Sequence, residues 1–158
     1  MENARAATPA DIPRIVELAH ALRSELRDMR GGGLWETREA RLRPNAESVG
    51  PFLARDDTYI ALGTIDDAVI GYGTVDIEVL EDGSRLGVVG DLFVEDGARA
   101  VGVGEAIADA LVAFCTAGGC VGVDAFALPG HRTAKNFFER SGFTARALLM
   151  HKRLPDPT

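Results

Sequence analysis

Apolar residues recur with two periods along the 158-residue chain, and each period predicts a different kind of element. A spacing of three to four residues predicts helices with one buried face, and strict alternation predicts half-buried strands. The segment from Thr8 to Met29 shows the helical pattern, with Pro9 at the first helical position and Asp11 as the reciprocal acid of a capping box. We expect, in order, an N-terminal strand, that helix, a helix over 46–55, strands over 59–64, 69–80 and 86–94, a helix from about 103, a strand over 121–128, a helix over 131–140 and a last strand over 143–154.

Turn-forming residues separate the expected strands. Asp66 and Asp67 join the first two strands of the central run into a hairpin, and the sequence EDGS over 81–84 forms the next turn. In the strand over 86–94, the alternation places Val89, Asp91 and Phe93 on one face, so Asp91 is a charge inside an otherwise apolar strand. An antiparallel run followed by a strand–helix–strand unit predicts a mixed α+β fold, in a single domain over residues 1–158.

Three consecutive glycines, Gly31 to Gly33, interrupt the pattern after the first long helix. We expect that this run does not hold a helix, because glycine loses more backbone entropy on ordering than any other residue. The loop that continues to Trp35 is then either a lid over a substrate or a long connection, and the sequence leaves both interpretations open.

Composition excludes several classes of protein. Hydrophobic residues make up 46% of the chain and charged residues 26%, which is not the balance of a disordered protein. No apolar run reaches the length of a membrane span or a signal peptide, and Cys115 and Cys120 stand in no metal or redox spacing. We therefore expect a cytoplasmic protein with reduced, buried thiols, no membrane contact and no metal.

The net charge of −7 is distributed unevenly. Residues 56–124 hold 2 basic and 14 acidic side chains, a net charge of −12. Residues 125–158 hold 6 basic and 2 acidic side chains, a net charge of +4. An acidic total argues against a nucleic-acid partner, whose footprint is a basic stripe. The acidic middle suggests a cationic ligand, although a solvated acidic face would give the same count.

Two glycines one residue apart, Gly102 and Gly104, stand between a strand and a helix. Backbone N–H groups there are unshielded and lie at the positive end of the helix dipole, an arrangement that binds phosphate. The alternative is that small residues let the helix start pack on the sheet. A mononucleotide P-loop is excluded because Glu105 follows in place of Lys, and a dinucleotide fingerprint fits poorly because Ile107 stands at its third glycine.

The stretch DLFVEDGARAVGVGEAI over 91–107 resembles the signature of the GNAT superfamily of acyl-CoA-dependent N-acetyltransferases, in which Arg or Gln, two spacers, Gly, a spacer and Gly or Ala follow a strand. HRTAKNFFERSGF over 131–143 resembles its second signature, a helix that ends in a Gly-Phe pair. With the matching order of elements, the resemblance covers nearly the whole chain. It implies a GNAT-like fold: a twisted, mostly antiparallel central sheet with a splayed pair of parallel strands and flanking helices.

The resemblance also implies acetyl-CoA as co-substrate, with its pantetheine arm between the splayed strands and its pyrophosphate on the amides at the helix start. No metal is needed, because the thioester is already activated. Arg132, Lys135 and Asn136 would line the outer end of the cofactor, although a solvated helix face explains them equally well. The other candidate cofactor residues are Leu92, Phe93, Val94, Arg99, Val101, Gly102, Val103, Gly104 and Glu105.

Family chemistry is direct attack of an amine on the thioester, and an amine with a pKa near 10 must first lose a proton. Asp91 is the first candidate base, because apolar neighbours would raise the pKa of its carboxyl. Glu78 and then Asp76, on the neighbouring strand, are the next candidates. The alternative for each is a structural or substrate-orienting carboxylate. If Asp91 is the base, Asp91→Asn should lower turnover with little loss of cofactor affinity.

The sequence departs from the family pattern at Phe138, where relatives usually carry the tyrosine that protonates the leaving thiolate. A phenyl ring cannot donate that proton. His131, Ser141, Tyr72 or water could replace it, and none is marked out by spacing. His131 is therefore a candidate catalytic residue, with a solvated histidine at a helix start as the alternative.

These patterns predict an N-acetyltransferase that moves an acetyl group from acetyl-CoA to a primary amine of a small molecule or peptide. The alternative is a catalytically weak GNAT-like module that binds acyl-CoA as a sensor or interaction domain. The last strand, with Leu148, Leu149 and Met150, could pair across a homodimer as in many relatives. The sequence does not name the amine.

Overall fold

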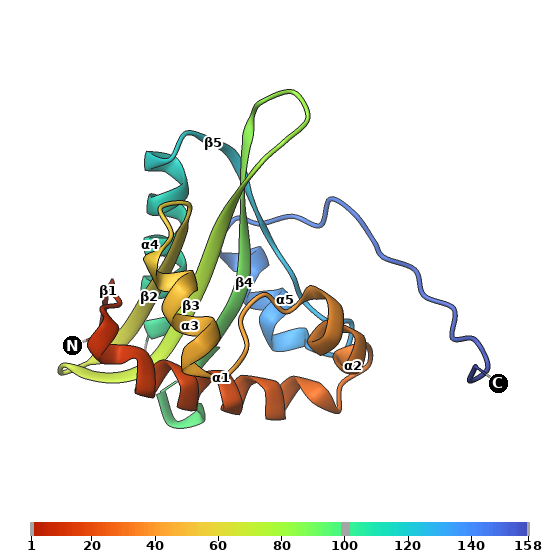
Figure 1. The fold of residues 1–158 in the computed structure, drawn as a ribbon, viewed down its shortest axis with the longest axis horizontal. Helices are drawn as coiled ribbons and strands as arrows, with labels where there is room; N and C mark the ends of the chain where they lie inside the picture. Colours follow the sequence, from red (N-terminus) through yellow and green to blue (C-terminus); the bar gives the residue numbers. More distant parts are fainter. Residues whose placement is uncertain (1, 99–101, 158) are drawn as a thin grey trace.

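One five-stranded sheet forms the centre of the molecule in a computed structural model that describes residues 2–98 and 102–157. Its strands lie in chain order, and every neighbouring pair is antiparallel except the last, β4 and β5, which is parallel. This is the mixed α+β sheet with one parallel pair that the sequence predicts (Figure 1). The strands are β1 (Glu2–Ala6), β2 (Thr58–Ile65), β3 (Ala68–Val79), β4 (Arg85–Val94) and β5 (Cys120–Ala125).

The predicted hairpin turn between β2 and β3 is confirmed. Asp66 and Asp67 both adopt the left-handed backbone conformation, with φ of 48° and 69°. Two successive residues with positive φ form the turn whose twist matches that of the flanking strands, and Asp tolerates it better than most residues. The next hairpin, between β3 and β4, projects well beyond the rest of the sheet at the top of Figure 1.

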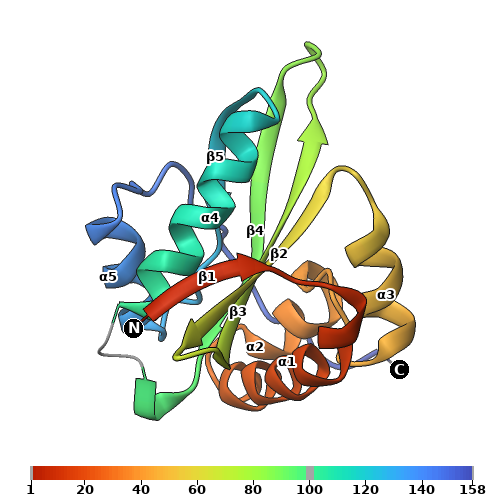
Figure 2. The ribbon, with the colours of Figure 1, turned by 90° about the vertical axis from the view of Figure 1, so that its left-hand side faces the viewer.

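Helices cover both faces of the sheet (Figure 2). On one face, α4 packs through Val103, Ile107 and Leu111, each 0–1% exposed, because these residues recur at helical spacing. On the other face, α1 and α3 share a core with residues of β2, β3 and β4. No helix in the described ranges is long and apolar enough to cross a membrane. The helices are α1 (Ile12–Arg27), α2 (Gly32–Leu34), α3 (Ala46–Ala54), α4 (Val103–Ala117) and α5 (Arg132–Arg140), with short turns η1 (Pro9–Asp11), η2 (Trp35–Glu39) and η3 (Asp96–Ala98).

A β-bulge in β4 changes which face each of its side chains occupies. Val75 of β3 lies opposite Val89, but Gly73 lies opposite Leu92, so Thr74 faces two residues of β4 where regular pairing would give one. The backbone N–H of Asp91 donates to the Thr74 hydroxyl at 2.9 Å. Consequently Val89 packs under α4 while Phe93 packs on the α1 face, and the prediction that Val89 and Phe93 share a face is wrong.

The glycine run after α1 holds a helical turn, contrary to the prediction. Gly31 takes a left-handed φ of 81°, and Gly32 begins α2, which continues into η2. A Cβ on Gly32 would lie 1.9 Å from the carbonyl oxygen of Leu26, so only glycine lets the chain fold back this closely on the end of α1. The glycines therefore serve a tight reversal that places Trp35 in the core, where it is 4% exposed.

The strand predicted over 143–154 does not form. Residues 143–157 have no regular secondary structure and run away from the sheet as an extended tail (Figure 1). Leu148, Leu149 and Met150 are 86%, 67% and 85% exposed. Apolar β-rich sequence predicts a strand only if a partner edge receives its hydrogen bonds, and a pattern along one chain carries no information about that partner. In the described residues, Arg146 is paired with Asp124 of β5 through its guanidinium, which holds the start of the tail beside the sheet.

Candidate functional site

The parallel strands β4 and β5 pair only over part of their length. Their register ends where Val89 lies opposite Ala125, and a cavity of about 140 Å³ follows the remainder of β4. We call it the β4–α5 cavity, because β4 forms one wall and α5 another. Its far end reaches the first turn of α4. Among its lining residues are Gly90, Leu92, Phe93, Val94, Gly104, Glu105, His131, Thr133, Ala134, Phe137 and Phe138.

The start of α4 has the features expected of an anion-binding helix terminus. Gly102 caps the 15-residue helix with a left-handed φ of 83°, and no side chain of the described residues caps its first amides. Gly104 lies against α5: a Cβ there would be 3.2 Å from the ring carbon Cε1 of Phe137. A glycine at this position therefore keeps the backbone accessible while the two helices approach each other.

Most of the predicted cofactor residues that the structure describes gather around this cavity. Leu92, Phe93, Val94, Gly104 and Glu105 line it. Gly102 and Val103 begin α4 at its end, and the Val103 side chain is buried under the helix, so only its backbone is available there. Arg99 and Val101 lie outside the described residues. Arg132 and Asn136 are exposed on α5, on a different side from the residues of that helix that line the cavity.

Phe138 faces the cavity at the position where the family pattern has tyrosine. It is 8% exposed and packs edge-on against Phe137 and Phe143. His131, at the start of the same helix, also lines the cavity, and its Nε2 lies 3.8 Å from Oε2 of Glu25 on α1. Of the three predicted catalytic residues, His131 is the one that the cavity wall includes.

Asp91 lies behind that wall, in the core between the sheet and α1. The bulge turns its carboxylate toward Tyr72, whose hydroxyl donates to Oδ2 at 2.6 Å. Burial raises the pKa of Asp91 to about 6, against the opposing effects of the Tyr72 hydrogen bond and the Arg23 charge. Burial and the nearby Asp91 charge raise the pKa of Tyr72 well above its usual value. Asp91 thus belongs to a satisfied buried polar cluster.

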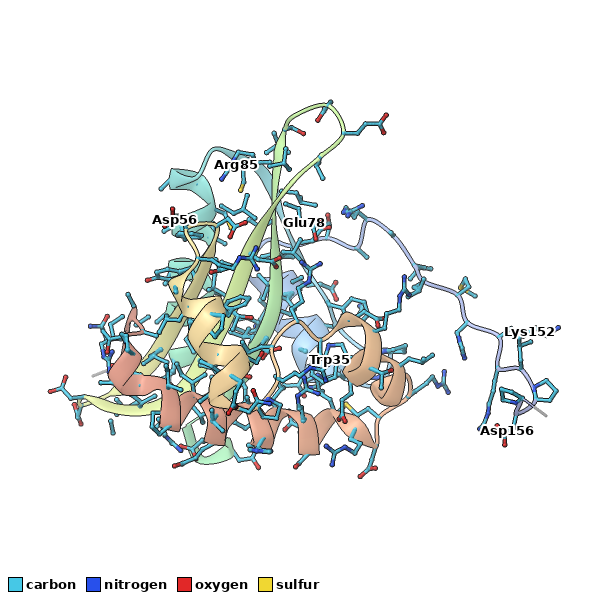
Figure 3. All side chains as sticks on the ribbon, in the orientation of Figure 1. Trp35, Asp56, Glu78, Arg85, Lys152 and Asp156 are labelled. Atoms are coloured by element: carbon cyan, nitrogen blue, oxygen red, sulfur yellow. The ribbon has the colours of Figure 1, made fainter. Side chains whose placement is uncertain are left out.

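The other predicted acids are engaged by one arginine. Arg41, in the loop after η2, donates to Oδ2 of Asp76 at 2.5 Å and to Oε1 of Glu78 at 2.7 Å. Burial raises the pKa of Asp76, although the Arg41 guanidinium opposes that shift. The two carboxylates on β3 are therefore occupied by a cation from the protein itself. Figure 3 shows Glu78 on the upper part of the sheet and Trp35 below it, beside the turns that follow α1.

A second hollow, of about 490 Å³, opens between η2 and the bulged part of β4. We call it the η2 cleft. Its walls are partly apolar, from Trp35, Val88 and Phe126, and partly charged, from the segment that follows Trp35. The side-chain oxygen Oε2 of Glu39 is buried there and has no hydrogen-bond partner among the described residues. Lining residues are Trp35, Arg38, Glu39, Arg41, Val88, Val89, Gly90, Phe126 and Leu149.

Nothing in the residue pattern of the sequence marks out Glu39. Its place depends on the tight reversal at Gly31 and on the π-helical turn Trp35–Glu39, and neither is recognisable from residue pattern. Glu36, in the same turn, instead accepts a hydrogen bond from Arg27 at 3.0 Å. No periodicity distinguishes these two acids, so only the structure separates them.

The β4–α5 cavity and the η2 cleft meet at a common wall. Trp35, Val89, Gly90 and Phe126 line both. The wall lies where β4 bulges and where its pairing with β5 ends. A long ligand in the cavity and a small ligand in the cleft would therefore meet beside Gly90.

Three kinds of comparison place this architecture among known proteins. The sequence matches the family model described as "Acetyltransferase (GNAT) family" over residues 18–143. No curated protein matches the sequence at a significant level. A Bacillus halodurans protein, solved as a tetramutant, superposes with a TM-score of 0.79 at 17% identity, over 96% of this chain and 99% of that one.

Two further solved structures carry functional names. Glucosamine-6-phosphate N-acetyltransferase from Arabidopsis thaliana superposes with a TM-score of 0.68 at 19% identity, over 98% of this chain and 99% of that one. An aminoglycoside acetyltransferase from an uncultured soil metagenomic sample, in complex with trehalose, superposes with a TM-score of 0.70 at 18% identity, over 99% of this chain and 97% of that one. At such identities these likenesses establish the fold. The family match, which covers most of the chain, establishes more: the protein belongs to the GNAT family of acetyltransferases, whose co-substrate is acetyl-CoA.

Proposed function

We propose that the protein transfers an acetyl group from acetyl-CoA to a primary amine of a small molecule or peptide by direct attack. The observation that carries this proposal is the β4–α5 cavity, which begins where the β4–β5 pairing ends and reaches the glycine-capped start of α4. Apolar β4 side chains suit a pantetheine arm, and helix amides suit a pyrophosphate. Acetyl-CoA would supply an activated thioester at the wall shared with the η2 cleft.

The protein's own residues would then handle protons. Of the predicted catalytic residues, His131 faces the cavity, so we assign it the protonation of the departing sulfur. Asp91 and Glu78 are hydrogen-bonded to Tyr72 and Arg41, and each would have to exchange that partner for the substrate to act as a base. The acceptor's nitrogen forms the C–N bond as the C–S bond breaks.

Calorimetric titration with acetyl-CoA and a thiol-release assay over a panel of amines test the proposal together. We expect cofactor binding in the micromolar range typical of enzymes and release that depends on an amine. No binding at millimolar acetyl-CoA would refute it.

Phe138 supports one alternative function, an acyl-CoA-binding module with little turnover, because the cavity lacks the hydroxyl that the family pattern places there. The same two measurements separate the alternatives. Binding with amine-dependent thiol release supports the enzyme, whereas binding without release on any amine supports the module.

We also propose that the tail mediates homodimerisation. Leu148, Leu149 and Met150 form an exposed apolar run, and β5 is the last strand of the sheet, beside which Arg146 holds the tail. An apolar run of this exposure favours burial against a second copy. Sedimentation velocity of the full chain measures this directly.

A further inference from the structure

Glu39 has a buried carboxylate oxygen without a partner, in a cleft that adjoins the expected reaction centre. Oε2 makes no hydrogen bond to any described residue. Burying a carboxylate oxygen without a donor or a cation is costly, and such groups are rare in folded proteins except where water, an ion or a ligand completes them or the site is catalytic. Arg41, which also lines the cleft, is already held by Asp76 and Glu78.

The other acids near the cleft do not share this property. The carboxylate of Asp76 accepts from Arg41, Glu78 accepts from the same guanidinium, and Glu36 accepts from Arg27. Asp91 accepts from the Tyr72 hydroxyl and is not one of the described residues lining either hollow. Glu39 is thus the acid in this region whose buried oxygen has no partner among the described residues.

The surroundings of Glu39 indicate the chemistry of that ligand. A buried carboxylate oxygen binds a donor with positive charge most strongly. Arg38 lines the same cleft but is exposed, so water screens its charge. Trp35 and Phe126 provide apolar and aromatic surface beside the acid. This combination fits a compact ammonium group attached to an apolar or cyclic body.

We infer that Glu39 binds the ammonium group of the acceptor amine in the η2 cleft and accepts its first proton. The inference rests on the proposed acetyl transfer and names the group that would prepare the amine for it. The cleft shares Trp35, Val89, Gly90 and Phe126 with the β4–α5 cavity, so an amine on Glu39 lies next to the place where the thioester would arrive. Proximity of this kind accounts for a large part of catalysis in two-substrate reactions.

The proton balance is complete. An ammonium gives one proton to Glu39, and the neutral nitrogen attacks the thioester carbonyl, so that the C–N bond forms and the C–S bond breaks. The second proton that the nitrogen must lose ends on the departing sulfur. Glu39 then returns its proton to water, and the products are an amide, a thiol and one proton.

Binding can be tested without turnover, because Trp35 is the single tryptophan of the chain and lines the cleft. We would titrate benzylamine, an ammonium at neutral pH, and benzyl alcohol, its neutral analogue, and follow Trp35 fluorescence. The wild type should bind the ammonium about tenfold more tightly than the alcohol, as expected for a charge-assisted contact. Glu39→Gln should abolish that preference.

Glu36→Gln is the matched control, because it removes a carboxylate from the same turn that already has Arg27 as partner. It should keep the wild-type preference. A preference that survives in Glu39→Gln, or that is absent in the wild type, would overturn the inference. Thermal unfolding of both variants establishes that they are folded.

A turnover measurement then separates this inference from the proposed function. Benzylamine should lose about 100-fold in kcat/KM in Glu39→Gln, as for other general bases, while an arylamine, which is already neutral at pH 7, should lose far less. Equal losses for both amines would contradict the proton role. If no amine releases thiol in the wild type while the ammonium preference persists, the binding site stands and acetyl transfer is refuted.

Discussion

Asp91 is buried and Glu39 is half-buried with one buried carboxylate oxygen, and the two acids differ in whether the protein itself pairs them. Asp91 comes from a strand, and Tyr72 and Arg23 surround it, so the protein itself completes its interactions. Glu39 comes from an irregular turn that lines a cleft, and its buried oxygen Oε2 has no donor among the described residues. A charge in a strand is conspicuous in a sequence, whereas a charge in a turn is not. The acid that the sequence pattern marks out is paired inside the protein, and the acid that it does not mark out lines the cleft.

The largest effect that we expect is a change in the stability of the Asp91→Asn variant, which tests whether Asp91 is a structural acid. Burial raises the pKa of the Asp91 carboxyl to about 6 in the folded protein, from an ordinary value near 4, so the folded state holds its proton more tightly than the unfolded state. Stability therefore falls as pH rises from about 4 to 6, and the charged form costs about 3 kcal/mol above that range. Asparagine avoids the charge and can still accept from Tyr72, so the variant should be more stable than the wild type at pH 7.

Chemical denaturation at pH 4 and pH 7 measures this difference, which should shrink toward pH 4. Turnover of the same variant decides between the two acids. We expect Asp91→Asn to keep turnover within about threefold, because Glu39 takes the proton. A loss near 100-fold, with acetyl-CoA affinity unchanged, would restore Asp91 as the base and contradict the assignment to Glu39.

The second test adds the hydroxyl that the cavity lacks. Phe138→Tyr places a phenol in the wall where the leaving sulfur would lie, and a proton donor there should raise kcat about tenfold. Phe143→Tyr is the control, because Phe143 packs against Phe138 without lining either hollow. Steady-state thiol release with one amine measures both. If Phe138→Tyr changes nothing, His131 or water already supplies the proton adequately.

The third test separates cofactor binding at the backbone amides of α4 from ammonium binding by the side chains of the η2 cleft. Gly104→Ala places a methyl group 3.2 Å from Phe137, at the helix start expected to bind pyrophosphate. We expect acetyl-CoA affinity to fall about fivefold with no change in the ammonium preference of the cleft. Gly33→Ala makes the same chemical change where nothing lies within 4 Å, and it should alter neither. Calorimetry provides both affinities.

The smallest expected effect comes from removing residues 147–158. Leu149 is the contribution of the tail to the described cleft wall, and it is mostly exposed, so amine affinity should change only about twofold. Arg146 remains to pair with Asp124. Sedimentation should show a dimer for the full chain and a monomer for the truncated one. A dimer that survives truncation would place the interface elsewhere.

Sequence pattern predicts this fold well wherever backbone periodicity decides the outcome. The helix at Val103, the hairpin at Asp66 and the parallel pair β4–β5 follow from spacing and turn chemistry. Spacing also predicts the glycine-capped start of α4 beside the cavity, since glycines at a helix start act through the backbone. Pattern fails where one extra residue in β4 moves Val89 to the other face, and where the strand predicted over 143–154 lacks a partner edge. It also fails at Glu39, whose position depends on how the chain reverses at Gly31.

The buried oxygen of Glu39 also bears on how tightly the cleft would hold the acetylated product. An amide nitrogen carries no positive charge, so acetylation removes the feature by which the cleft holds its ligand. The product returns Glu39 to the state without a partner that the structure shows. Product inhibition by the acetylated amine should therefore be weak, and the product should dissociate from the cleft without a conformational change.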